Sequence, residues 1–207
     1  MKKFLELVAE KKKAMKMLLN NSKSEKKYRV CNNCKKEIPN NDNICQNCQL
    51  IEKADRLVGA ANVFAVGSFV PTLDHFPILS KVNPRHWDFI LSVAGVFIVA
   101  TILNGLQLDN DQGDTLMDIV EKKLSEWDTD GTRAFDDCKS LFEKEYDRLA
   151  VSPEYQKDRQ FISVDALGIW IVWNLFNRQP QNNEEISLVR VTGSLVMHTF
   201  HNWWKLS

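Results

Sequence analysis

Apolar residues recur at helical spacing through the second half of the chain. Two segments, 114–127 and 132–149, each carry one apolar face and predict amphipathic helices joined by a turn at 128–131. The first face consists of Leu116, Ile119, Val120, Leu124 and Trp127. The second face consists of Phe135, Cys138, Phe142, Tyr146 and Leu149. These patterns predict soluble helices that each bury one side.

The helical pattern continues to the end of the chain. Residues 164–177 are apolar nearly all round and predict a central helix, and residues 184–204 predict a last helix after the loop 177–185. Ser152-Pro153-Glu154 predicts a helix start, because it combines a capping hydroxyl, a proline in the first turn and a carboxylate near the positive helix end. Outside a cysteine-rich segment no strand pattern rivals these helices, so the predicted fold class is mainly α.

Two nearly uncharged stretches precede these helices. Residues 89–106 are the most apolar segment, with a mean hydropathy of about 2 over nineteen residues, in the range of membrane-spanning helices. At 18 residues this segment is only just long enough to cross a bilayer. A second span over 57–79 would be broken by Pro71 and Pro77. Two interpretations stay open: a buried pair of very apolar helices, which is favoured, or a membrane anchor.

The N-terminal region is basic. Residues 2–20 predict an amphipathic helix, and residues 20–30 have the polar, basic composition of a linker. Charges recur among the first 16 residues, so no apolar region typical of an export signal forms. We therefore expect the protein in the cytoplasm, with membrane association as the alternative.

Charge is distributed unevenly along the 207 residues, although the net charge is zero. Residues 1–56 hold 14 Lys and Arg against 7 Asp and Glu, which leaves 13 against 20 for the remainder. A basic head of this kind suits an acidic protein surface, nucleic acid or anionic lipid. The alternative is that the two halves of the chain face each other.

Four of the five cysteines form two Cys-x-x-Cys pairs separated by ten residues, namely Cys31, Cys34, Cys45 and Cys48. Without an export signal, this spacing indicates a metal site rather than disulfides. Two tight turns that each supply two thiolates would complete a tetrahedron around Zn²⁺. Four thiolates leave no open position, so the site is predicted to be structural rather than catalytic. A module this small has almost no core, and metal binding would supply its folding free energy.

The segment CNNCKKEIPNNDNICQNC resembles the short zinc ribbon found near the N-terminus of many bacterial proteins. The resemblance rests on the two cysteine pairs and on Ile38, Pro39 and Ile44, which occupy its typical apolar and proline positions. It covers about 20 residues and implies a zinc-binding fold, often beside a membrane segment or a regulatory domain, and no particular reaction. The glycine that usually follows each pair is replaced by Lys35 and Gln49.

Other candidate sites are weaker. His198 and His201 could share a helix face and bind a metal, but surface histidines without a third ligand are the favoured interpretation. Cys138 lies on an apolar stripe and is predicted to be a buried, inert thiol.

These observations predict three parts: a basic helix and linker (1–30), a zinc ribbon (31–50) and a helical domain (55–207). The favoured function is non-enzymatic. The basic part would bind a protein partner, and the helical domain would offer a second interface. The alternatives are a membrane-anchored zinc-ribbon protein, a regulator that binds nucleic acid through residues 1–56, and a helical toxin or effector enzyme.

Overall fold

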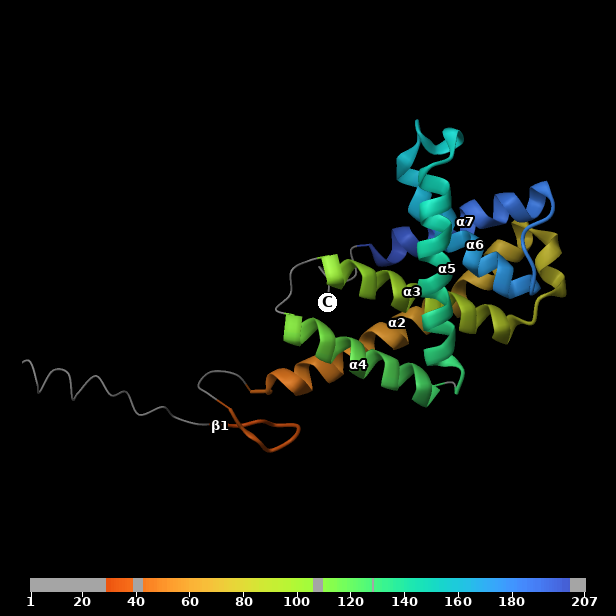
Figure 1. The fold of residues 1–207 in the computed structure, drawn as a ribbon. Helices are drawn as coiled ribbons and strands as arrows, with labels where there is room; N and C mark the ends of the chain where they lie inside the picture. The colour runs from red at the N-terminus through yellow and green to blue at the C-terminus, as the bar shows by residue number, and fades with distance from the viewer. Residues whose placement is uncertain (1–28, 39–42, 106–109, 128, 202–207) are drawn as a thin grey trace, which may run out of the picture. The chain divides into compact units, whose positions relative to one another are not determined.

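A computed structural model describes residues 29–38, 43–105, 110–127 and 129–201. The predicted helix at 2–20 and most of the linker at 20–30 lie outside these residues. The described chain contains six α-helices, labelled α2 to α7, and one two-stranded sheet (Figure 1). The predicted mainly α fold is therefore confirmed. The chain divides into two compact units, and the boundary between them along the sequence lies between Gln49 and Leu50.

The first unit holds the sheet. Strands β1 (Arg29–Val30) and β2 (Glu37–Ile38) are antiparallel, with Arg29 opposite Ile38 and Val30 opposite Glu37. Helix α2 (Gln46–His75) begins between the last two cysteines. The hairpin therefore encloses the first cysteine pair, rather than spanning the gap between the two pairs.

Helix α2 runs through Pro71, so the predicted break at this residue is wrong. Pro71 lies in the last turn of the helix and is exposed, so the ring costs only one hydrogen bond near a helix end. The 3₁₀ helix η1 (Pro77–Lys81) follows.

The outward face of α2 is apolar. Its exposed residues from position 59 to 71 are Gly59, Val63, Val66, Gly67, Val70 and Pro71. Val63 is the most exposed of the three valines, at 73%. Among the described residues α2 is the one helix long and apolar enough to cross a bilayer, with a mean hydropathy of 1.4 over 18 residues, 28% of which are buried. A single helix of this kind is weak evidence for a membrane protein, because some core helices pass the same test.

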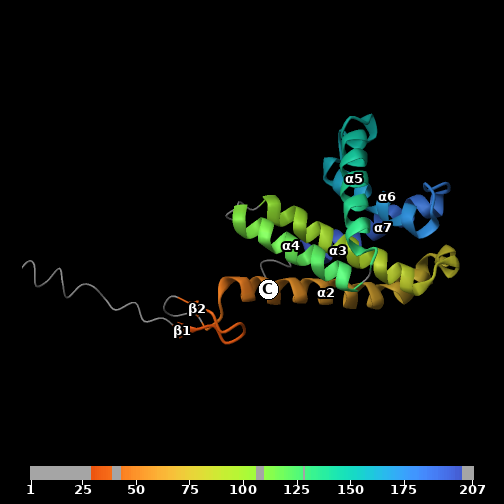
Figure 2. The same ribbon diagram turned by 60° about the horizontal axis from the view of Figure 1, so that its bottom comes forward.

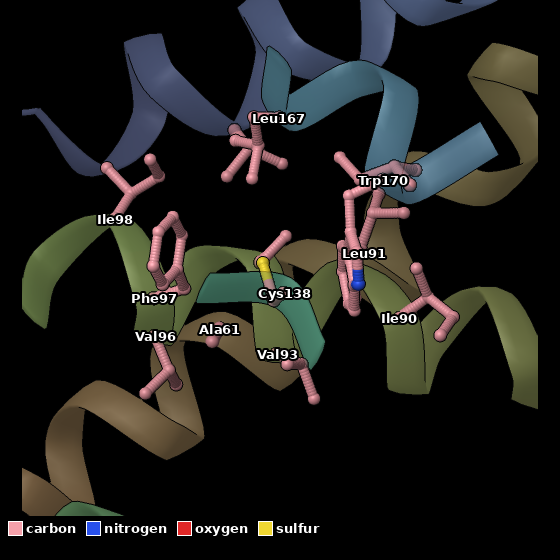
Figure 3. Close-up of a cluster of buried hydrophobic side chains, with 14 of the residues drawn as sticks. Ala61, Ile90, Leu91, Val93, Val96, Phe97, Ile98, Cys138, Leu167 and Trp170 are labelled. Atoms are coloured by element: carbon pink, nitrogen blue, oxygen red, sulfur yellow. The ribbon is translucent and has the colours of Figure 1, made fainter. Parts of the chain in front are cut away.

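Helix α3 (Pro84–Gly105) forms the centre of the second unit. Every residue from 91 to 100 is buried. Figure 3 shows this helix meeting Ala61 of α2, Cys138 of α5, and Leu167 and Trp170 of α6. Residues 91–100 of the most apolar segment are thus enclosed by other helices, as the buried-helix interpretation expects.

Helices α4 (Asn110–Trp127) and α5 (Gly131–Ala150) match the two predicted amphipathic segments. Helix α5 contacts α3 and α4 and runs at a steep angle to both, whereas α3 and α4 run side by side (Figures 1 and 2). The predicted apolar face of α5 is correct at Phe135, Cys138 and Leu149 but wrong at Tyr146, which is exposed. Its neighbour Glu145 is buried instead, because it pairs with Arg148.

The predicted helix start at residues 152–154 is correct only for a short 3₁₀ helix. Pro153–Tyr155 form a single 3₁₀ turn, and the Ser152 side chain accepts no capping hydrogen bond. A second turn at Arg159–Phe161 leads into α6 (Ile162–Phe176). The Tyr155 hydroxyl donates to Asp165 of α6 at 2.5 Å, so this segment folds back onto the helix instead of extending.

Helices α6 and α7 (Asn183–Phe200) pack against each other, and α6 confirms the predicted central helix. The left-handed Asn177 ends α6, and the Asn182 side chain caps α7 by accepting from the Glu185 amide at 2.9 Å. The predicted extension of the last helix to residue 204 passes beyond the described residues.

Candidate metal centre

The four paired cysteines come together in the first unit. The Sγ atoms of the four cysteines all lie within 4.8 Å of one another; these residues are Cys31, Cys34, Cys45 and Cys48. Cys34 Sγ and Cys45 Sγ are 3.5 Å apart. Cys31 and Cys48 are buried, and Cys34 is exposed at the edge of the cluster. This cluster could hold one metal ion.

The first cysteine pair sits in the turn between β1 and β2. The Cys31 amide donates to the Lys36 carbonyl at 2.8 Å, and the Lys35 amide donates to the Cys31 carbonyl at 3.0 Å. Lys35 adopts a left-handed conformation with φ 62°. In the zinc ribbons that this segment resembles, glycine usually occupies this position, so the turn keeps its geometry without the residue that favours it.

The second pair has a different geometry. Cys45 directly precedes α2, and Cys48 lies in the first turn of that helix. The Gln49 amide donates to the Cys45 carbonyl at 3.0 Å. The tight turn predicted for this pair is the first turn of a helix, which brings the two thiols to the same side.

A very small core accompanies the cluster. Ile38 is buried, and Ile44 is partly buried against the cysteines. Apart from these two apolar side chains, the described core of this unit consists of the cysteines themselves. Little apolar area is thus available to stabilise the module, and an ion that bridges the thiolates would contribute most of its folding free energy.

Hydrogen bonds to sulfur shape the titration of the thiols. The backbone amides of Cys34 and Cys45 lower the pKa of Cys31 to about 6, and the Cys45 amide lies 3.2 Å from its sulfur. By contrast, the neighbouring Cys45 thiol and burial raise the pKa of Cys48 to about 12. Four thiolates this close repel one another, so a bound cation is needed to keep all of them ionised.

The ligand set determines the chemistry available at such a centre. The group consists of four cysteines, and in the described part of the chain no imidazole or carboxylate joins it. A tetrahedral ion bound by all four thiolates has no free position for a substrate. The centre is therefore suited to holding the module together.

The remaining candidates lie elsewhere. His198 and His201 are exposed near the end of α7 and belong to no potential metal group among the described residues. Cys138 is fully buried in the helical core, and burial raises the pKa of its thiol well above the ordinary value. Its predicted burial is confirmed.

Three buried carboxylates were missed by the sequence reasoning: Glu145, Asp165 and Glu185. Each pairs with an arginine, and these partners are Arg148, Arg190 and Arg178 respectively. Asp165 carried a usable signal, because it is the one charged residue in the otherwise apolar segment 162–176. A lone charge in a central helix predicts a buried partner.

The chain was also compared with known proteins. No protein-family model, no curated protein and no solved structure matches it. Its function must therefore be inferred from its own residues.

Proposed function

We propose that this protein is a non-enzymatic adaptor built on a structural zinc module. The module would bind a protein partner through its basic surface, and the helical unit would provide a second interface. The observation that carries the proposal is the set of four thiols within 4.8 Å of one another.

Zinc is the metal that this donor set favours. Four thiolates at two Cys-x-x-Cys pairs form a typical structural zinc site, whereas magnesium and calcium prefer oxygen ligands. A closed tetrahedron supports a structural role for the ion, because a catalytic zinc keeps a position for water or substrate.

The chemistry of the partner follows from the charges around the cluster. Arg29, Lys35 and Lys36 are exposed, and Glu37 is the exposed carboxylate beside them. A positively charged surface favours binding to an acidic protein. Nucleic acid carries the same sign of charge, and its binding is the rival outcome of the experiment.

The experiment uses the full chain, loaded with zinc. Crosslinking in cells identifies the protein that contacts the module, and binding is then measured with both purified components. We expect one zinc per chain, loss of binding after Cys34→Ser, and weaker binding after Lys36→Glu. The matched controls are Cys138→Ala and Lys157→Glu, which change a cysteine and an exposed lysine outside the module. Partner binding that is unchanged by Cys34→Ser would disprove the adaptor proposal, as would binding of RNA or DNA alone.

Membrane association is a second candidate, and the exposed apolar face of α2 favours it. This face extends from Gly59 to Pro71, about 18 Å at the rise of an α-helix. The sequence predicted an anchor at 89–106, with 57–79 as a possible second span, and residues 91–100 are enclosed by other helices. The segment that supports an anchor is therefore α2.

Vesicle flotation tests this candidate with the full chain. Retention on lipid vesicles in high salt, lost in Val66→Lys but kept in Val151→Lys, would support insertion of the α2 face. Val151 is the matched control, because it is 77% exposed and lies outside α2. Release of the wild-type chain by salt alone would rule the anchor out.

A further inference from the structure

A cleft of about 750 Å³ opens in the helical unit, and none of the four paired cysteines lines it. It is lined by α5, α6, α7 and the turn at Pro153–Tyr155. Since α5 and α7 both pack on α6, residues of α6 line the cleft between the other two helices. The volume lies within the range of small-molecule sites, which is about 300–1,000 Å³.

One arginine of this cleft is held by a buried carboxylate. Asp165 accepts hydrogen bonds from Nε and Nη2 of Arg190 and from the Tyr155 hydroxyl. The Arg190 guanidinium also lies 4.4 Å from the centre of the Phe161 ring. Its side chain is nevertheless 45% exposed, and Nη1 makes no hydrogen bond among the described residues. The guanidinium is thus fixed in orientation and keeps one donor edge free.

A second arginine repeats this arrangement. Arg148 donates from Nε to Oε2 of Glu145 at 2.7 Å, and its Nη2 lies 2.6 Å from the same oxygen as an ion pair. The Glu145 side chain is buried, whereas that of Arg148 is 58% exposed, with Nη1 likewise unused in the described structure. Two guanidinium groups, each oriented by a buried acid, therefore line the same cleft.

Charges that reach solvent in the cleft are mainly positive. Lys144, Arg148 and Arg190 are exposed, against the one exposed carboxylate of Glu154. The carboxylates that balance the arginines are buried, so a ligand would meet the cations first. Guanidinium groups with free donor edges suit carboxylate and phosphate groups.

The same cleft has an apolar part. Ile169 of α6 and Ile186 of α7 line it, and Ile186 is exposed to solvent. An exposed isoleucine beside oriented arginines suits a ligand that has an acidic head and an apolar body. We propose that this cleft binds a small amphiphilic anion, with its acidic head at Arg148 and Arg190 and its apolar chain against Ile169 and Ile186.

Calorimetry on the zinc-loaded full chain tests the proposal with three probes: octanoate, octyl phosphate and octanol. All are used below the concentration at which they form micelles. We expect one molecule of at least one anion to bind per chain, and at least tenfold weaker binding of octanol, since a charge-assisted hydrogen bond is lost. Preference for octanoate or octyl phosphate identifies the head group. Absence of binding by both anions, or equal binding of octanol, overturns the proposal.

Variants then locate the site. Glu145→Gln/Arg148→Gln removes the cation without leaving a buried charge unpaired, and binding should weaken about tenfold. Ile186→Ser should also weaken binding about tenfold, because apolar contact is lost. The controls, Lys157→Gln and Val63→Ser, change residues outside the cleft and should leave binding unchanged. Circular dichroism confirms that each variant is folded, and equal effects in the site and control variants would place binding elsewhere.

Discussion

Gly168 of α6 lies directly against the backbone of Val189 in α7. A Cβ atom at Gly168 would come within 1.9 Å of the Val189 carbonyl oxygen. The contact is reciprocal, because a Cβ at Gly193 of α7 would lie 2.0 Å from the Val164 carbonyl oxygen of α6. The two helices therefore cross with their backbones in contact, and this close crossing brings Arg190 to the Asp165 carboxylate.

Because α6 and α7 are in backbone contact at Gly168, we expect even a substitution by alanine to lower the stability of the protein strongly. Gly168→Ala should lower the free energy of unfolding by about 3 kcal/mol, because the new methyl group meets backbone that cannot move without separating the helices. Urea unfolding followed by tryptophan fluorescence measures this change. All six tryptophans lie between residues 87 and 204, so the signal reports on the helical unit.

Gly67 provides the matched control for this prediction. It also lies inside a helix, but a Cβ there would have nothing within 4 Å. Gly67→Ala should therefore stabilise the helical unit by up to about 1 kcal/mol through helix propensity. Equal stability of Gly168→Ala and the wild type would contradict the close crossing.

Because the chain divides into two compact units, we expect loss of the metal to unfold the cysteine module without destabilising the helical unit. Cys45→Ser should abolish zinc binding, measured as zinc per chain by mass spectrometry, and should change tryptophan-detected stability by less than about 0.5 kcal/mol. Cys138→Ser should show the reverse pattern. It should keep the zinc and lose about 1–3 kcal/mol, because it buries a hydroxyl in the apolar core. Cooperative unfolding of the whole chain by Cys45→Ser would show that the module is integral to the helical core.

Most of the helices could be predicted from the sequence, and the exceptions have specific causes. Leu116, Val120 and Leu124 repeat at helical spacing, and the same spacing buries them in the structure. Ser152 carries a local capping signal, but its segment is held by a contact between Tyr155 and Asp165. Local sequence does not contain such a contact between residues of different elements.

The metal ligands could be predicted from the sequence, whereas the residues that line the cleft could not. The spacing of the cysteines was sufficient to predict that Cys31 and Cys48 share a site, because both pairs lie in a short chain segment. Arg148, Asp165 and Arg190 come from three helices, and their approach depends on how α5 and α7 pack on α6. The spacing of apolar residues predicts each of these helices, but it does not predict that their charged side chains come together.

Lys35 leads to a prediction about zinc affinity. Its left-handed backbone costs an L-residue about 1–2 kcal/mol, so Lys35→Gly should tighten zinc binding several-fold, because metal binding and folding of the module are coupled. The hydrogen bond from Lys35 Nζ to the Asn32 carbonyl is lost, but it is exposed and contributes little. Competition with a chromogenic chelator measures the affinity.

Gln49 is the informative control, since it follows the second cysteine pair as Lys35 follows the first. Gln49 lies in helix α2 and has no positive φ, so Gln49→Gly should weaken zinc binding or leave it unchanged. Tighter binding in Gln49→Gly, or weaker binding in Lys35→Gly, would contradict the geometry of the two pairs.

The last prediction concerns pH and the buried carboxylate of Glu185. Arg178 donates to both of its oxygens, at 2.8 and 2.7 Å, and the Gln181 amide donates to one of them at 2.7 Å. The hydrogen bonds from Arg178 are the main reason that the pKa of Glu185 falls to about 2. Because this value lies below the unfolded value of about 4.3, the stabilisation is complete above that pH and is lost as the pH falls toward 2.

Glu185→Gln should therefore lower the free energy of unfolding by about 3 kcal/mol at pH 7, since Arg178 loses its charged partner. The difference from the wild type should shrink below pH 4 and nearly vanish near pH 2, in tryptophan-detected urea unfolding at a series of pH values. Comparison at each pH removes the separate effect of zinc release in acid, because both chains lose the metal. The exposed neighbour Glu184 is the control, and Glu184→Gln should change stability by less than about 1 kcal/mol throughout. A Glu185→Gln difference that stays constant from pH 7 to pH 3 would show that the ionised carboxylate is not the source of the stabilisation.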